Sequence, residues 1–227
     1  LPSKYNTEES LVDARLLAEN LDIEFKVIEI EEIVNIFRNT LKESVNDELG
    51  QITDENIQSR VRGNILMALS NQTGAMVVST GNKSEMAVGY STLYGDLAGG
   101  FALLKDLYKT EVYNLANFRN SISSVIPQNT IDKEPSAELR PDQFDKDSLP
   151  EYELLDEILR MYIEEDSSSE KIISKGIDEN IVYDVLSKVD RNEYKRKQVA
   201  PGVKLTEKAF GKDRRMPITN TYIRERG

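Results

Sequence analysis

The sequence contains no cysteine and no histidine among its 227 residues. The absence of cysteine excludes a disulfide scaffold, a zinc–thiolate site and a thiol nucleophile. The absence of histidine excludes Ser-His-Asp catalysis and removes the commonest metal ligand. If this chain is an enzyme, it must therefore work with carboxylates, lysines, backbone amides and a hard cation such as Mg²⁺.

Long apolar runs are also missing. No stretch of 18 apolar residues and no secretory leader occurs, so we expect a cytoplasmic protein without membrane contact. The length fits one α/β domain, or one domain with an appendage. The net charge of −11 argues against a general nucleic-acid binder.

The charge is distributed unevenly along the chain. Residues 191–227 hold 11 lysines and arginines against 4 acids, which leaves −18 on the remainder. We therefore predict an acidic core over residues 1–190 and a basic tail over residues 191–227. Such a tail is expected to close on the core or to meet an anionic ligand there.

Apolar periodicity predicts alternating helices and strands. Helices are expected over Thr7–Asn20 and Ile33–Val45, from a cap at Thr53 to Leu69, from Asp106 or Thr110, over Ser148–Ile163, and over Ile181–Val189. Strands are expected at Phe25–Ile30 and Ala75–Val78, and a long loop at Asn120–Pro150. Helix, strand and helix at such short spacing indicate a parallel α/β sheet.

A cluster of small polar residues follows the second predicted strand, from Ser79 to Glu85. In open α/β sheets, ligands bind beyond the carboxyl ends of the strands, which is where this cluster would stand. Three glycines and an acid come next, between Gly95 and Gly100, and then Lys105 and Lys109. The combination suits a phosphate-bearing ligand. It equally suits a glycine-rich loop between a strand and a helix, and spacing alone leaves both interpretations open.

A polar row accompanies the core-facing stripe of the predicted Thr53–Leu69 helix. Asn56, Arg60 and Asn64 recur every four residues, so they share one helix face. Ile57, Val61, Ile65 and Leu69 form the neighbouring apolar stripe. The polar row is either a solvated flank or a ligand-facing edge, and its spacing does not decide between them.

Five ordered blocks, spread over nearly the whole chain, resemble a known family. They are Thr80-Gly-Asn-Lys-Ser-Glu85, Tyr94-Gly-Asp-Leu-Ala-Gly-Gly100, Pro135-Ser-Ala-Glu-Leu-Arg-Pro-Asp142, Asp190-Arg-Asn-Glu-Tyr-Lys195 and Phe210-Gly-Lys-Asp-Arg-Arg215. They resemble the synthetase domain of glutamine-dependent NAD synthetase, an N-type ATP pyrophosphatase. The resemblance implies an adenine-nucleotide α-hydrolase-like (Rossmann-like) parallel sheet with flanking helices. It also implies adenylation of deamido-NAD by ATP, followed by attack of ammonia to give NAD and AMP.

The resemblance implies roles for eight residues. It implies ATP contacts for Thr80, Lys109 and Ser136, and deamido-NAD contacts for Asn56, Arg60, Glu85 and Lys195. Glu85 is also the implied Mg²⁺ ligand, although an acid there equally serves to begin a helix. Asp96 either orients ammonia or stabilises the glycine-rich loop. Lys83 and Lys105 are explained equally well as solvated side chains.

Two departures from the family pattern bear on activity. The family holds pyrophosphate in a Ser-Gly-Gly-x-Asp-Ser loop after its first strand, and the match begins downstream of that loop, at Pro2–Tyr5. The family's amino-terminal glutaminase, which needs a cysteine nucleophile, is not in this sequence either. We therefore expect a carboxy-terminal piece, without the first strand and phosphate loop, that makes little NAD alone.

The implied partners are that glutaminase domain and further copies of the chain. The predicted helix from Asn56 to Leu69 is a candidate contact surface between copies. A non-catalytic interaction domain of the same fold is the alternative function. A nucleic-acid reader built on the basic tail is disfavoured by the overall acidity.

Overall fold

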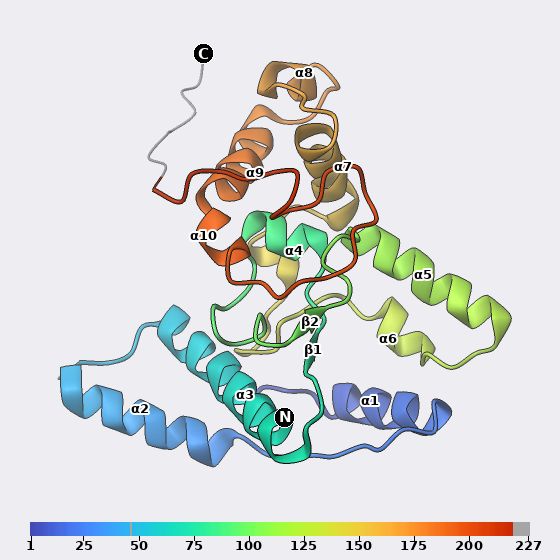
Figure 1. Ribbon diagram of the computed structural model, residues 1–227. Coiled ribbons are helices and arrows are strands. Elements are labelled where there is room, and N and C mark those ends of the chain that lie inside the picture. Colours follow the sequence, from blue (N-terminus) through green and yellow to red (C-terminus); the bar gives the residue numbers. More distant parts are fainter. Residues whose placement is uncertain (46, 220–227) are drawn as a thin grey trace.

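The computed structural model describes residues 1–45 and 47–219. Three helices lie at one end of the molecule and four at the other, with the two strands between them (Figure 1). The first group is α1 (Glu8–Asn20), α2 (Glu31–Val45) and α3 (Gln51–Thr73). The second is α7 (Tyr152–Ile163), α8 (Ser169–Ile173), α9 (Glu179–Arg191) and α10 (Glu193–Arg196). Between them are β1 (Val78–Ser79), α4 (Lys83–Val88), β2 (Phe101–Ala102), α5 (Lys109–Ile122) and α6 (Gln128–Asp132).

The two strands form a parallel pair, with Val78 opposite Phe101 and Ser79 opposite Ala102. Parallel pairing confirms the predicted kind of sheet, and in the described part of the chain this pair is all of it. The strand predicted at Phe25–Ile30 is wrong, because no described strand lies beside it to complete a ladder. Ile30 anchors its end, because the Ile30 N–H donates to the Pro2 carbonyl over 3.0 Å and the Ile30 carbonyl accepts the N–H of Val34 over 2.9 Å.

The larger apolar core lies where α4, α7 and α9 pack together (Figure 1). Leu155, Ile158 and Leu159 of α7 are fully buried against Val185 and Leu186 of α9. These residues repeat every three or four positions, so each helix turns one apolar stripe inward. This core gives α4 a fixed base at one side of the molecule.

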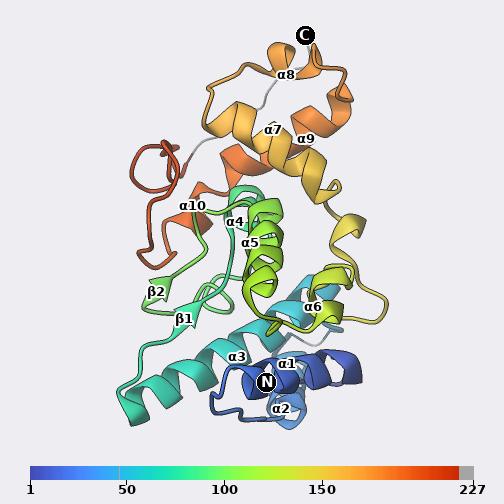
Figure 2. The ribbon, with the colours of Figure 1, turned by 90° about the vertical axis from the view of Figure 1, so that its right-hand side faces the viewer.

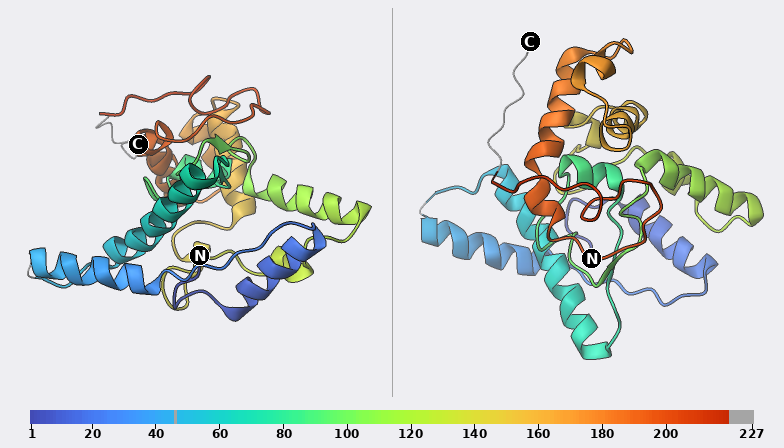
Figure 3. Two further views of the ribbon diagram at one scale, coloured as in Figure 1. Left: turned by 60° about the horizontal axis from the view of Figure 1, so that its bottom comes forward. Right: turned by 45° about the horizontal axis from the view of Figure 1, so that its top comes forward.

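A smaller core joins α2 and α3, which pack side by side (Figure 3). Ile57 and Val61 are buried there, as predicted, but Leu69 is 38% exposed because the end of α3 extends beyond α2. The predicted cap at Thr53 is also wrong. The helix begins at Gln51 after Gly50, whose backbone takes the cap position without a side-chain hydrogen bond.

The predicted beginning of the first helix is confirmed. Thr7 caps α1, and its hydroxyl accepts the N–H of Ser10 over 3.2 Å. The predicted loop at Asn120–Pro150 holds α6 and a short 3₁₀ turn, Asp145–Asp147. Figure 2 shows that α5 runs beside α4 and that α6 lies next to α1, so this region bridges the two ends.

The chain after α10 returns over α4 and β2 (Figure 1). Ala102 donates its N–H to the Pro201 carbonyl over 2.9 Å. Asp106 accepts the N–H groups of Leu205 and Thr206, each over 2.7 Å. Of the basic tail predicted over residues 191–227, the last eight residues lie outside the described residues.

Candidate functional site

A cavity of about 940 Å³ separates the two ends of the molecule. The side chains that line it come from the segment before α1, from α1, α3, α4, α5, α6 and α10, from the loop after α4 and from the segment between α6 and α7. Six of the eight residues singled out in the sequence are among them: Asn56, Glu85, Asp96, Lys109, Ser136 and Lys195. Of these six residues, Asn56 and Lys195 are the furthest apart in the chain, by 139 positions, and both line the same cavity.

Glu85 begins a helix and also lines the cavity. Its Oε2 accepts the N–H of Asn82 over 3.1 Å while Asn82 Oδ1 accepts the N–H of Glu85 over 3.0 Å, a complete capping box at the start of α4. Its Oε1 lies 3.0 Å from Nζ of Lys109 at the cavity wall. Glu85 thus fixes the beginning of α4 and still presents a carboxylate oxygen to the cavity.

Lys109 is the first residue of α5 and is about four-fifths buried. Burial alone lowers the pKa of Lys109, but the neighbouring Glu85 carboxylate outweighs that effect, so the net shift is upward. The ammonium also stands 5.1 Å from the centre of the Tyr152 ring. Lys109 is therefore a fully charged cation held at the cavity wall.

Asp96 lies in the glycine-rich loop and opens into the cavity. Its Oδ1 accepts the N–H of Thr92 over 2.6 Å, and its own N–H donates to Ser59 Oγ over 3.1 Å. Protein surrounds the carboxylate on the sides away from the cavity, and this desolvation raises its pKa to about 6, with a further contribution from Glu85. Asp96 both ties the loop together and titrates close to neutral pH.

Lys195, in α10, reaches the same loop from the opposite side. Its Nζ donates to the carbonyls of Gly89 and Ser91, each over 2.7 Å. Burial lowers the pKa of Lys195, and nearby Asp96 partly offsets that shift. The side chain thereby closes one edge of the cavity.

The polar row of α3 faces this loop, although its members are placed differently. Asn56 accepts the Thr92 hydroxyl over 2.7 Å and lines the cavity. Arg60 is exposed, donates to the Leu93 carbonyl over 3.2 Å, and does not line the cavity in the described part of the chain. Asn56 and Arg60 therefore form a contact edge between α3 and the loop, whereas Asn64, the third member of the row, is exposed.

Ser136 stands on the wall formed by the segment between α6 and α7. Its hydroxyl accepts the N–H of Glu138 over 3.0 Å. The Glu138 carboxylate in turn accepts hydrogen bonds from Lys133, Ser10 and Asn6, at 2.6, 2.6 and 2.9 Å. This network anchors the Ser136 loop to the beginning of α1.

Thr80 follows β1 directly and lines a smaller pocket of about 260 Å³. Glu85, Asp96 and Lys109 line both that pocket and the large cavity. The carboxyl end of the strand thus opens onto the same group of charged side chains, as the sequence predicted for a ligand site.

The sequence does not indicate that the charged side chains of Asp145 and Lys83 are buried. Asp145 is 5% exposed and lines the cavity. Tyr152 donates a hydrogen bond to its Oδ2 over 2.7 Å, whereas its Oδ1 has no hydrogen-bond partner in the described part of the chain. Lys83 is completely buried, with Nζ 3.0 Å from both Asp106 and Glu164. A proline-rich loop and a Gly-Asn-Lys-Ser turn give no local signal of such burial.

Of the two interpretations left open for Lys83 and Lys105, the solvated side chain is wrong for Lys83. Lys83 is enclosed as described above, and Lys105 is partly buried and donates to the Ala200 carbonyl over 2.9 Å. Both residues hold the returning C-terminal segment against α4 and β2. Neither lines the large cavity in the described part of the chain.

A sequence model of the NAD synthase family matches residues 1–199. The chain belongs to this family. It is 53% identical over 224 residues to the glutamine-dependent NAD(+) synthetase of Aquifex aeolicus, covering 99% of this chain and 40% of the relative. It is 54% identical to that of Thermotoga maritima, covering 98% of this chain and 39% of the relative. The chain thus spans about two-fifths of the length of these relatives.

Solved structures agree with the family. The glutamine-dependent NAD+ synthetase of Acinetobacter baumannii, solved in complex with ADP, is 46% identical over 99% of this chain and 40% of its own, with a TM-score of 0.57. The NMN synthetase of Francisella tularensis is 28% identical over 90% of this chain and 75% of its own, with a TM-score of 0.69. The predicted α/β, Rossmann-like fold class is thereby confirmed.

Within the described residues, no helix is long and apolar enough to cross a membrane. The same residues contain no group of three or more acids arranged to hold a metal ion.

Proposed function

We propose that this chain catalyses the ATP-dependent amidation of deamido-NAD to NAD, as the synthetase part of a longer glutamine-dependent enzyme in the cytoplasm. The observation that carries the proposal is the convergence of six of the eight expected site residues on one cavity of about 940 Å³, with Thr80 in the adjoining pocket. Membership of the NAD synthase family supports the reaction class.

The resemblance to the family supports an assignment of the two substrates to different residues of the site. ATP is assigned to the side of Thr80, Lys109 and Ser136, where a buried ammonium can meet phosphate oxygens. Deamido-NAD is assigned to Asn56, Arg60, Glu85 and Lys195, around the glycine-rich loop. Arg60 stands beside the cavity, so a dinucleotide that extends along α3 would reach it.

The proposed chemistry has two steps. A carboxylate oxygen of the nicotinate ring attacks the α-phosphorus of ATP, and pyrophosphate leaves. The nitrogen of ammonia then attacks the carbonyl carbon of the acyl-adenylate, AMP leaves, and one proton must be removed from nitrogen. Asp96 is the proposed acceptor, because an acid with a pKa of about 6 is ionised at neutral pH yet retains affinity for a proton.

The residues of the cavity fit a magnesium ion. Mg²⁺ uses one or two carboxylates together with water and substrate phosphates, so it needs no cluster of three acids. Glu85 would hold it, and Asp145 is a second carboxylate on the lining of the same cavity. When bound, the ion neutralises charge on the phosphates. Lys109, which now pairs with Glu85, would be released toward the phosphates.

The proposed partners follow from the relatives' length. Ammonia would come from glutamine hydrolysed in an amino-terminal domain, since the matched relatives are glutamine-dependent and this chain covers about 40% of the first of them. Residues 1–190 would supply the substrate site, and residues 191–227 would close on it through Lys195. We expect the 227-residue chain alone to bind ATP poorly and to form little NAD.

The test is to assay the complete gene product with deamido-NAD, ATP, Mg²⁺ and ammonia. NAD, AMP and pyrophosphate should appear in equal amounts, and glutamine should replace ammonia. Other enzymes with the ATP pyrophosphatase fold adenylate xanthylate or tRNA. Release of AMP and pyrophosphate only with one of these two substrates would contradict the assignment of deamido-NAD. The 227-residue chain assayed beside it tests the expected loss of activity.

Lys109→Ala tests the ATP half of the site in the same protein. We expect kcat/KM for ATP to fall by about 10²–10³-fold, as when a positioned charge stabiliser is removed. Lys212→Ala is the matched control, because Lys212 is exposed and lies away from the cavity lining. Equal turnover in the two variants would make Lys109 an ordinary surface lysine.

Association of copies is a second proposed property. Leu66, Met67 and Leu69 of α3 are each 38% exposed, and Ile36 of α2 is 61% exposed. Exposed apolar side chains on α3 and on the adjacent α2 favour a protein contact there. Sedimentation of Leu66→Asp against the unaltered protein would reveal a smaller species, and an unchanged sedimentation coefficient would move the contact elsewhere.

A further inference from the structure

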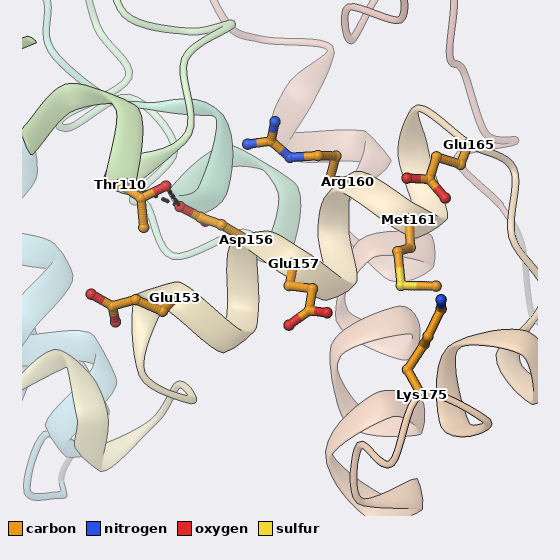
Figure 4. Close-up of a pocket in the computed structure, with 8 residues that line it drawn as sticks. All are labelled: Thr110, Glu153, Asp156, Glu157, Arg160, Met161, Glu165 and Lys175. Carbon is orange, nitrogen blue, oxygen red and sulfur yellow. Dashed lines mark hydrogen bonds between the residues drawn. The ribbon is translucent and has the colours of Figure 1, made fainter. Parts of the chain in front are cut away.

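Asp156 is a buried carboxylate in α7 that contacts the beginnings of two other helices. It is 3% exposed. Oδ2 accepts two hydrogen bonds from Thr110, from the N–H over 2.9 Å and from Oγ1 over 2.8 Å (Figure 4). Oδ1 accepts a hydrogen bond from the Ser84 hydroxyl. Ser84 Oγ in turn accepts the N–H of Lys109 over 2.9 Å.

The three donors explain why a carboxylate is needed here. An ionised carboxylate offers only acceptor sites, on two oxygens, so it can receive all three hydrogen bonds. An asparagine has one acceptor oxygen, and its NH₂ group would face Ser84. The Ser84 proton would then have no acceptor in a site where that residue is completely buried.

These contacts determine where the charged pair of the cavity stands. Ser84 is next to Glu85 in α4, and Thr110 is next to Lys109 in α5. Asp156 therefore holds both helices one residue away from the 3.0 Å contact between Glu85 and Lys109. Its place at two helix N-termini also suits a negative charge.

We propose that Asp156 is a positioning residue, which holds the beginnings of α4 and α5 so that Glu85 and Lys109 face the cavity with fixed geometry. The proposal rests on the proposed ATP-dependent amidation for its kinetic consequence. The geometry itself comes from the contacts of Ser84 and Thr110. Asp156 touches neither the cavity lining nor, in this arrangement, the reacting atoms.

A kinetic double-mutant cycle on the complete enzyme tests how Asp156 acts. Asp156→Asn should lower kcat/KM for ATP by about 10- to 100-fold, because small misplacements of a charged group are costly. In a Lys109→Ala background the same change should cost several-fold less, since only Glu85 then remains to be positioned. An equal loss in both backgrounds would overturn the proposal, because general destabilisation does not depend on Lys109.

The matched control is Glu157→Gln. Glu157 is exposed on the same helix and points away from Thr110 along a surface pocket of about 390 Å³ (Figure 4). It removes the same charge from α7 without touching α4 or α5. Its kcat/KM should match that of the unaltered enzyme, and a loss equal to that of Asp156→Asn would overturn the proposal.

Hydrogen–deuterium exchange of the complete protein tests the positioning role of Asp156 without any assay of activity. Exchange in the peptide that carries the Lys109 and Thr110 amides should quicken at least about tenfold in Asp156→Asn, while α9 stays protected. Ser84→Ala, a smaller change, should quicken the same peptide. Unchanged exchange in both variants would overturn the proposal. If the two variants exchange faster than the unaltered enzyme but the unaltered enzyme makes no NAD, the proposed function fails and the positioning role of Asp156 is still supported.

Discussion

Replacing Lys83 with methionine removes the central charge of a buried network. Lys83 Nζ lies 3.0 Å from Asp106 and 3.0 Å from Glu164, and it donates to Thr206 Oγ1 over 2.6 Å. Its side chain is 0% exposed and that of Asp106 is 2% exposed. Methionine has a similar length and no charge, so the substitution isolates the electrostatic loss from the packing.

The expected cost follows from what remains after the substitution. Breaking a buried ion pair by removing one partner costs about 3–5 kcal/mol. Asp106 keeps its hydrogen bonds from Leu205 and Thr206, and Glu164 is 20% exposed and can be rehydrated. We therefore expect the lower end, about 3 kcal/mol, which corresponds to a fall in Tm of about 6–12 °C for a domain of this size.

The assay is thermal unfolding followed by circular dichroism, together with limited trypsin digestion. Digestion should quicken at Lys204 and Lys208, because Lys83 holds the segment between them. Lys26→Met is the control, since Lys26 and its partner Glu24 are 65% and 75% exposed and such surface pairs contribute at most about 1 kcal/mol. A Lys83→Met Tm no lower than that of Lys26→Met would refute the reasoning.

Two further predictions concern the glycine-rich loop. The pKa of Asp96 is raised from 3.8 to about 6, so its contribution to stability is present below pH 3.8 and is lost as the pH rises through about 6; Asp96→Asn should remove this part of the pH dependence. A carbon-13 NMR titration should give an Asp96 midpoint near 6 that falls in Glu85→Gln, and a midpoint near 3.8 in the unaltered protein would contradict the desolvation argument. A Cβ at Gly63 would stand 2.9 Å from two backbone carbonyl oxygens of the loop, so Gly63→Ala should lower the free energy of unfolding by about 1–3 kcal/mol despite the better helix propensity of alanine. Gly50→Ala, where nothing lies within 4 Å, is the control in the same denaturation experiment, and equal stability of the two variants would show that α3 and the loop can separate freely.

The sequence by itself determined the features that depend on neighbours along the chain. Thr7 caps α1 and Glu85 completes the capping box of α4, because the groups that they bond lie within three residues. The sequence also predicts the apolar stripes of α7 and α9. Its ordered motifs indicate the family to which the chain belongs.

Only the tertiary structure decided which charges are buried and which surfaces meet. Lys83 and Asp156 look like ordinary polar residues of helices, yet their partners lie 23 to 125 residues away. Phe25–Ile30 has the composition of a strand, but no described strand lies beside it to accept its hydrogen bonds. Whether a side chain is buried or paired depends on residues that are distant in the sequence, and a local sequence pattern specifies only one of the two contacting segments.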